Sequence, residues 1–82
     1  MKAAKLLQKA MQSPQNLRFS ELLSLAQAFG YTLDRVRGSH HILVHEAADR
    51  VLNFQEVGGK AKPYQARQFL RDIEEFNLRL IS

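Results

Sequence analysis

The sequence predicts an α+β domain in which helices pack on one face of a three-stranded antiparallel sheet. Two segments with helical spacing of apolar residues come first, strand-forming residues follow, and a third helical segment comes last. Short connections between the strands require antiparallel pairing, and segregated helices leave the other face of the sheet partly open. We therefore expect the order α-α-β-β-β-α over residues 1–82, as a single domain because the chain is too short for two cores.

Two helices are expected in the first thirty residues. Residues 3–12 are strong helix formers with an apolar stripe, and Pro14 follows where that helix must stop. A second helix is expected to begin near Ser20, a residue type that caps helix N-termini, with Glu21 in its first turn. Gly30 supplies the residue that commonly follows a helix C-terminus.

The second half of the chain predicts the sheet and the last helix. Strand formers occupy residues 31–37, 40–45 and 51–55, and a glycine-containing turn separates the first two strands. Residues 58–62 predict a flexible basic loop. Pro63 then suits the first position of a helix, because the missing N–H has no intrahelical partner there.

Composition favours a polyanionic partner. The net charge is +4 and the isoelectric point is near 9.9, which points to nucleic acid before other partners. The chain has no cysteine, so thiolate metal sites and disulfides are excluded. No apolar run reaches the roughly 18 residues of a membrane span, and the first residues lack a signal-peptide core. We expect a cytoplasmic protein with no membrane contact.

The segment from Arg35 to His45 contains all three histidines of the protein. These are the side chains whose ordinary pKa lies nearest neutrality, so proton chemistry at neutral pH is expected to begin there. A metal site is not expected, because His40 and His41 point to opposite faces of a strand. His41 and His45 share a face but lie about 13 Å apart, too far to converge on one ion.

His40 differs from the other two histidines because it follows a tight turn beside Arg35 and Arg37. Cationic neighbours favour a neutral imidazole that can accept a proton, and they attract a phosphodiester. Such an imidazole can deprotonate a ribose 2′-OH, which then attacks the adjacent phosphorus. This chemistry requires RNA and needs neither a metal nor a cofactor. His41 and His45 are expected to be solvated or half-buried strand residues.

The loop before the last helix contains Lys60 and Lys62 and ends at a helix N-terminus, where an anion is favoured. It is not a phosphate-binding loop of the nucleotide-hydrolysing type, because Ala61 stands where serine or threonine is required. Phosphate contact without nucleotide hydrolysis and an ordinary solvated loop are both consistent with this sequence.

Three segments, Phe19-Ser20-Glu21-Leu22, Phe29-Gly30-Tyr31 and Arg35 to Ile42, resemble the HicA (YcfA-like) family of bacterial toxins. The resemblance covers roughly residues 19–78, and Gly38-Ser39-His40 is its most specific element. It implies a fold like that of double-stranded-RNA-binding domains (dsRBD), ribosome-independent mRNA cleavage, and neutralisation by a HicB antitoxin. It also implies that His40 is catalytic and that Gly38 and Ser39 shape the turn that presents it.

Lys60-Ala61-Lys62 also resembles the lysine-bearing helix N-terminus of double-stranded-RNA-binding domains. Two features depart from the family pattern: residues 53–59 lack the Pro-x-His segment of many members, and the helix over residues 3–12 exceeds the minimal family length. Two alternatives stay open, a non-catalytic RNA-binding module and a protein-interaction domain that docks through its apolar ends. The sequence leaves the RNA specificity, the proton donor and the oligomeric state open.

Overall fold

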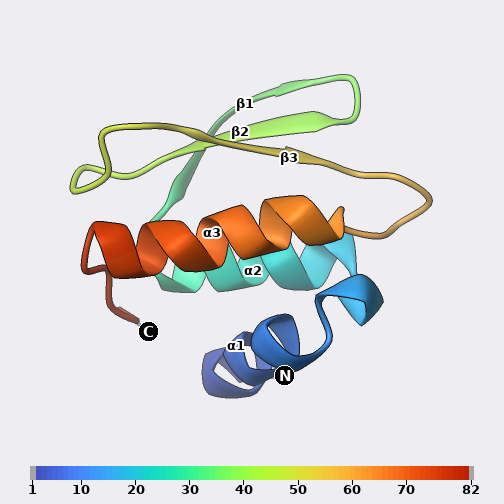
Figure 1. The fold of residues 1–82 in the computed structure, drawn as a ribbon. Helices are drawn as coiled ribbons and strands as arrows, with labels where there is room; N and C mark the ends of the chain where they lie inside the picture. The colour runs from blue at the N-terminus through green and yellow to red at the C-terminus, as the bar shows by residue number, and fades with distance from the viewer. Residues whose placement is uncertain (1, 82) are drawn as a thin grey trace.

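The computed structural model describes residues 2–81 and confirms the expected order α-α-β-β-β-α (Figure 1). Its elements are α1 (Ala3–Gln12), the short 3₁₀ helix η1 (Pro14–Asn16), α2 (Phe19–Ala28), β1 (Thr32–Arg37), β2 (His40–Val44), β3 (Leu52–Gln55) and α3 (Pro63–Glu75). Each predicted element is present, with strand ends that differ from the prediction by no more than one residue. No helix within residues 2–81 is long and apolar enough to cross a membrane.

The sheet is antiparallel throughout, in the order β1-β2-β3. Arg37 pairs with His40 at the tip of the first hairpin, and His40 pairs in turn with Gln55 of β3. The β1–β2 register shifts between Leu33 and Arg35, which marks a bulge in β1. All six residues of β1 are exposed, so this strand extends beyond the area that the helices cover.

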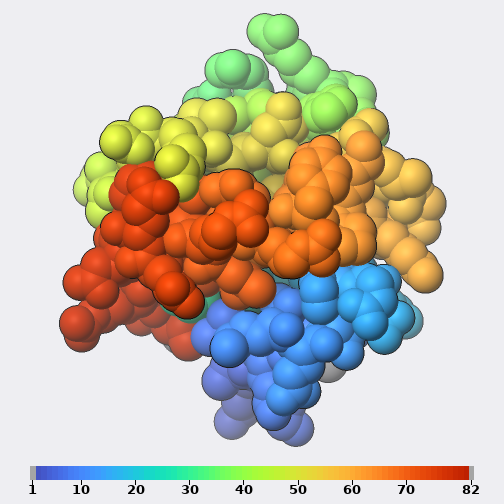
Figure 2. All heavy atoms as spheres, in the orientation of Figure 1, coloured from blue at the N-terminus to red at the C-terminus, as the bar shows by residue number. Residues whose placement is uncertain are grey.

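The molecule has a layer of two helices between the sheet and α1. Helices α2 and α3 lie side by side against one face of the sheet, while α1 lies on their far side (Figure 1). In the space-filling view, α1 and η1 lie below α3 and away from the strands (Figure 2). The expectation that helices cover one face therefore holds for α2 and α3, whereas α1 covers the helices themselves.

Aromatic rings form the centre of the core. Phe69 of α3 lies edge-on to Phe29, Tyr31 and Phe54, with ring centroids 5.8, 5.9 and 6.1 Å away. Burial raises the pKa of Tyr31 to about 12, so its phenol stays protonated at neutral pH. The other buried apolar side chains come from every part of the chain: Leu6, Ala10, Leu17, Phe19, Leu22, Leu25, Ala26, Leu43, Leu52, Ala61, Ala66 and Leu78.

Helix α2 begins at Phe19 with Arg18 as its N-cap, so the prediction that Ser20 caps this helix is wrong. The reason lies in Glu21, whose carboxylate accepts the backbone N–H of Arg18 at 3.0 Å. The same carboxylate accepts a hydrogen bond from Lys9 of α1 at 2.8 Å. The Lys9 ammonium, followed by the Arg18 N–H, lowers the pKa of Glu21. At the other end, Gly30 has φ of 97°, as a residue after a helix C-terminus often does.

The segment over residues 58–62 was expected to be a flexible loop, but the structure shows a hydrogen-bonded turn. Val57 and Lys60 exchange backbone hydrogen bonds of 3.1 and 3.0 Å. Gly59 accepts the N–H of Phe19 at 3.0 Å, and the N–H of Ala61 donates to Leu17 at 3.2 Å. The turn is thereby attached to the start of α2, a contact between distant segments that local sequence does not reveal.

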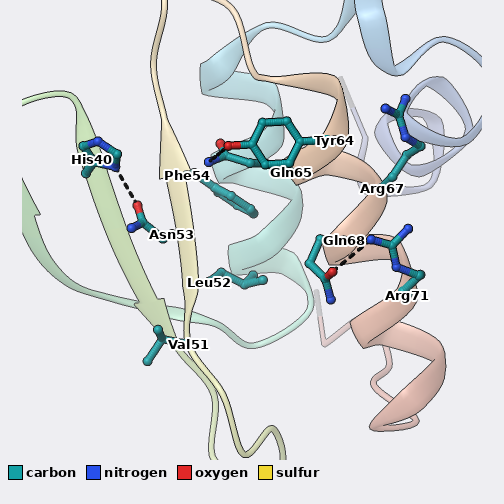
Figure 3. Close-up of a pocket in the computed structure, with 10 residues that line it drawn as sticks. All are labelled: His40, Val51, Leu52, Asn53, Phe54, Tyr64, Gln65, Arg67, Gln68 and Arg71. Carbon is teal, nitrogen blue, oxygen red and sulfur yellow. Dashed lines mark hydrogen bonds between the residues drawn. The ribbon is translucent and has the colours of Figure 1, made fainter.

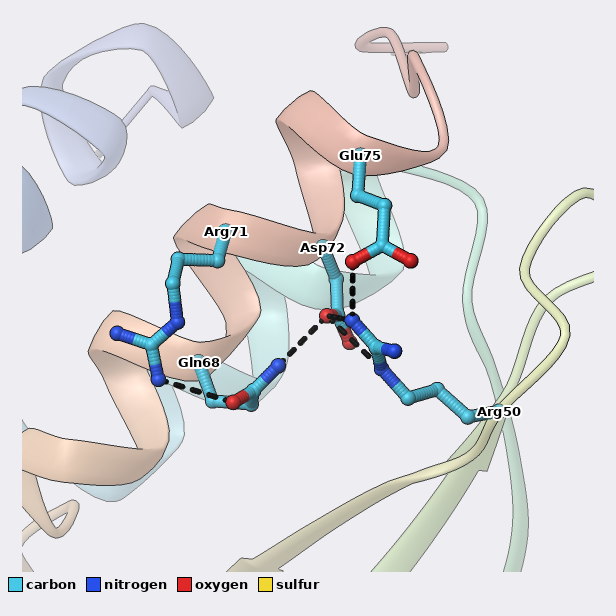
Figure 4. A network of polar contacts seen from close by, with 5 residues as sticks. All are labelled: Arg50, Gln68, Arg71, Asp72 and Glu75. Carbon is cyan, nitrogen blue, oxygen red and sulfur yellow. Dashed lines mark hydrogen bonds and ion pairs between the residues drawn. The ribbon is translucent and has the colours of Figure 1, made fainter.

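A polar network connects the segment after β2 to α3 (Figure 4). Arg50 donates to Asp72 and to Glu75, both at 2.6 Å, and Gln68 donates to the same oxygen of Asp72 at 2.8 Å. The Asp72 side chain is fully buried. Hydrogen bonds to Asp72 and then Glu75 raise the pKa of Arg50 further above its ordinary value, so it stays charged. The burial of Asp72 was not predicted from the sequence.

Candidate active site

A two-residue turn presents His40 at the start of β2. Gly38 has φ of 57° and no other residue in the turn has a positive φ, which is the pattern of a type II′ hairpin turn. Ser39 attaches the turn to β3, because its carbonyl accepts the N–H of Glu56 at 3.0 Å and its hydroxyl accepts Nε2 of Gln55 at 3.3 Å. The turn and the end of β3 thus fix the position of the His40 backbone.

The His40 imidazole is held by Asn53 of β3. Its Nδ1 lies 2.9 Å from Oδ1 of Asn53 (Figure 3). Because a carboxamide oxygen only accepts, Nδ1 carries a proton in this arrangement, and in the neutral ring Nε2 carries the lone pair. Among residues 2–81, Nε2 makes no hydrogen bond. The half-buried ring is therefore oriented with its basic nitrogen available to a bound molecule.

Two arginines share a hollow with this imidazole on the open face of the sheet. The hollow has a volume of about 320 Å³ and is lined by Arg35, Arg37, His40, Ile42 and Asn53. Arg35 forms an exposed ion pair with Asp34 at 2.9 Å, whereas Arg37 makes none within residues 2–81. The structure thus brings His40 together with the two arginines that the sequence singled out.

Lys60 and Lys62 lie elsewhere, near the N-terminus of α3, and neither lines a hollow with His40. Lys60 belongs to the turn that pairs with Val57 and Arg18. The Lys62 ammonium lies 5.8 Å from the centre of the Tyr64 ring, a cation–π distance. The two lysines are therefore not part of the surroundings of His40.

The other two histidines contact the helical layer. His41 packs against Phe19 with ring centroids 4.6 Å apart. His45 uses both nitrogens, since Nε2 lies 2.9 Å from the carbonyl of Phe29 and Nδ1 accepts the N–H of Ala47 at 2.9 Å. The three imidazoles thus occupy three separate environments, and only His40 lies on the open face.

The contact between Asn53 and His40 was not predicted from the sequence. A usable signal was present, because strand alternation places every second residue on the same face. In the observed register His40 lies opposite Gln55 and Ile42 lies opposite Asn53, so the amide is diagonal to the imidazole on the open face. The register was the missing information, and the long β2–β3 connection does not fix it.

The family model for the HicA toxin of bacterial toxin–antitoxin systems matches residues 19–74. The chain belongs to the HicA toxin family. As a HicA toxin it is the toxin of a toxin–antitoxin system, and its α+β sheet-and-helix arrangement fits the dsRBD-like fold.

The HicA match begins at the first residue of α2 and ends in the last turn of α3. It therefore contains the hairpin with His40, the Asn53 strand and the whole sheet, while α1 lies outside it. Comparisons with curated proteins and with solved structures give no match.

Proposed function

We propose that this HicA toxin is an endoribonuclease that cleaves mRNA with His40 as general base. The observation that carries the proposal is the oriented imidazole of His40. Its Nδ1 is bonded to Asn53, its Nε2 makes no hydrogen bond within residues 2–81, and the ring shares a hollow with Arg35 and Arg37. A neutral imidazole in this setting can take a proton from a ribose 2′-OH. The arginines can bind the phosphate and stabilise the charge that develops on it.

The reaction follows from this arrangement of groups. Nε2 removes the 2′-OH proton, and the 2′-oxygen forms a bond to the adjacent phosphorus while the bond from phosphorus to the 5′-oxygen breaks. The leaving 5′-oxygen takes a proton from solvent water, and the His40 imidazolium returns its proton to solvent. The products are a 2′,3′-cyclic phosphate and a new 5′-hydroxyl, and DNA is not a substrate because it lacks the nucleophile.

We propose Gly38 and Ser39 as the residues that shape the turn, and Lys60 and Lys62 as additional phosphate contacts at the start of α3. The positive φ of Gly38 and the bonds of Ser39 to β3 support the first assignment. The local basic charge and the positive end of the α3 dipole support the second.

The protein partner that we propose is a HicB-type antitoxin, in keeping with the toxin–antitoxin family. To neutralise the proposed activity, such a partner must keep RNA away from His40. The surface that it has to cover is the open sheet face around Arg35, Arg37 and His40.

The test is incubation of the purified protein with an end-labelled single-stranded RNA in EDTA. We expect cleavage by the parent, new ends that carry a 5′-hydroxyl, and loss of cleavage in His40→Ala. His41→Gln is the matched control, because it removes the adjacent imidazole from the opposite face. Cleavage that survives His40→Ala, or that requires an added metal ion, contradicts the mechanism. RNA retained without cleavage supports instead a binding module with the same fold.

A further inference from the structure

A second hollow begins at His40 and runs between the outer edge of β3 and helix α3 (Figure 3). This groove has a volume of about 440 Å³. Its lining combines strand and helix residues: His40, Val51, Leu52, Asn53, Phe54, Tyr64, Gln65, Arg67, Gln68 and Arg71. Because His40 lines both this groove and the hollow with Arg35 and Arg37, the imidazole lies where the two meet.

One face of α3 forms a polar and cationic wall of the groove. Tyr64, Arg67, Gln68 and Arg71 follow the spacing that aligns side chains on one side of a helix. Arg67 and Arg71 are one turn apart, about 6 Å along the axis. Both are exposed, and neither forms an ion pair within residues 2–81. These two guanidinium groups can contact neighbouring phosphates of a single nucleic-acid strand.

The opposite wall is formed by the β3 segment, where Val51 is an exposed apolar side chain, whereas Leu52 and Phe54 are buried in the core behind it. None of the residues that line the groove is acidic. The exposed ring of Tyr64 stands at the end nearest the start of α3, beside the Lys62 ammonium. A cationic wall and an exposed aromatic ring together suit a nucleotide strand, because its phosphates bind cations and its bases stack on aromatic rings.

The groove is less suited to an added peptide strand. Such a strand would need the outward backbone groups of β3, but the N–H of Gln55 already donates to Oε1 of Gln65 at 2.8 Å. Gln65 therefore closes the edge of β3 at the end of the groove near the hairpin turn. The volume suits one or two splayed nucleotides and not a duplex, which presents no free base to stack on Tyr64.

We propose that this groove binds the single-stranded RNA next to the scissile phosphate. Arg67 and Arg71 contact successive phosphates, and Tyr64 stacks on a base of the same strand. The inference rests on the proposed function, because His40 at the head of the groove defines which phosphate is cleaved. Tyr64 then influences which base is accepted at that position.

The first test measures the affinity of a short labelled single-stranded RNA in the His40→Ala background, where the probe stays intact. Arg67→Gln/Arg71→Gln is compared with Lys5→Gln/Arg79→Gln, which removes the same charge from exposed positions outside the groove. For the groove pair we expect the slope of log affinity against log salt to become shallower by about 1.4, for two lost phosphate contacts. The control pair should change this slope far less.

The second test concerns stacking. Tyr64→Leu should weaken binding about tenfold, the loss typical of one base–aromatic contact, while Tyr64→Phe keeps the ring and should bind as the parent does. Circular dichroism of each variant checks that the exposed substitutions leave the fold intact.

Any of three results overturns the inference: equal effects of the groove and control pairs, equal binding by Tyr64→Leu and Tyr64→Phe, or equal affinity of the parent for a fully paired RNA duplex. The outcome is separate from that of the proposed function. Groove-dependent binding with no cleavage by the parent would refute the nuclease alone, whereas cleavage that is unaffected by the groove substitutions would refute the groove alone.

Discussion

Asn53 determines which nitrogen of His40 is available for chemistry. Its side-chain oxygen accepts a hydrogen bond from Nδ1 at 2.9 Å, which leaves the lone pair on Nε2. Without this partner the ring can rotate about its side-chain bonds and exchange the roles of its nitrogens. In the proposed reaction we therefore expect Asn53 to act through His40 as a positioning residue, without contact to the reacting atoms.

We predict that Asn53→Ala lowers kcat for RNA cleavage at least tenfold with a smaller change in KM, because a misplaced general base loses most of its contribution. Asn53→Asp keeps an oxygen that accepts from Nδ1 and should retain more of the rate. Its added carboxylate favours the protonated imidazole, so the acidic limb of the pH–rate profile should move to higher pH. Equal loss in both variants, with unchanged pH profiles, would count against this role.

Gly30 is required for two reasons at once. Its φ of 97° disfavours any side chain, and a Cβ at this position would lie 2.8 Å from Nε2 of His45. We predict that Gly30→Ala lowers the free energy of unfolding by about 2 kcal/mol or more, measured by urea denaturation. Gly58→Ala is the matched control, since Gly58 has φ of 59° and open space around it. If both variants lose the same stability, the contact with His45 contributes nothing.

Among the contacts of single residues, the proximity of His40 to Arg35 and Arg37 could be predicted, because a two-residue turn determines the pairing of adjacent strands. The contact with Asn53 could not, since the connection from β2 to β3 is long and leaves the register open. The burial of the Asp72 carboxylate could not be predicted from the sequence either. Its partner Arg50 lies 22 positions earlier in the chain, and no local pattern pairs the two.

Among the elements, α1 and α2 are joined through Glu21. This carboxylate accepts from the Arg18 N–H at the start of α2 and from the Lys9 ammonium of α1. Both contacts favour the charged form and lower the pKa of Glu21 from its ordinary value of 4.5. The stability that they contribute is complete above the unfolded-state pKa and is lost as the pH falls through the lower folded-state pKa.

We therefore predict that Glu21→Gln lowers the free energy of unfolding at pH 7 by no more than about 1 kcal/mol. The difference between parent and variant should stay constant down to about pH 5 and shrink as the carboxylate becomes protonated. Urea denaturation at several pH values measures this. Glu74→Gln, an exposed change on α3 that is in no ion pair, is the control. A difference that persists unchanged at pH 3 would contradict the explanation.

The order and type of the elements could be predicted because their periodicities and end signals are local. Pro63 begins α3 and Gly30 follows α2, as their backbone preferences indicate. The place of α1 could not be predicted, since an apolar stripe shows that a helix face is buried without showing which surface covers it. The turn over residues 58–62 escaped prediction because its partners lie in the segment before α2.

For the molecule as a whole, the hydrogen bonds of Arg50 connect the segment between β2 and β3 to α3. We predict that Arg50→Met lowers Tm by about 10 °C or more, because it leaves the buried Asp72 carboxylate with Gln68 as its remaining donor. Arg50→Met/Asp72→Asn should recover part of this loss, since the buried charge is then absent. Thermal unfolding of the two variants measures the effect. If the double variant is less stable than Arg50→Met, the charge is not the cause.

The exposure of every residue in β1 has a consequence for how this toxin can diverge. Arg35 and Arg37 lie on a strand that contributes little to the core, and exposed substitutions of this kind usually change stability by less than about 0.5 kcal/mol. New side chains can therefore be tried there without threatening the folded state. Because the proposed cleavage needs Arg35 and Arg37, we expect antitoxin recognition to change at the other exposed positions of β1, such as Thr32 and Val36, while the structure that positions His40 stays the same.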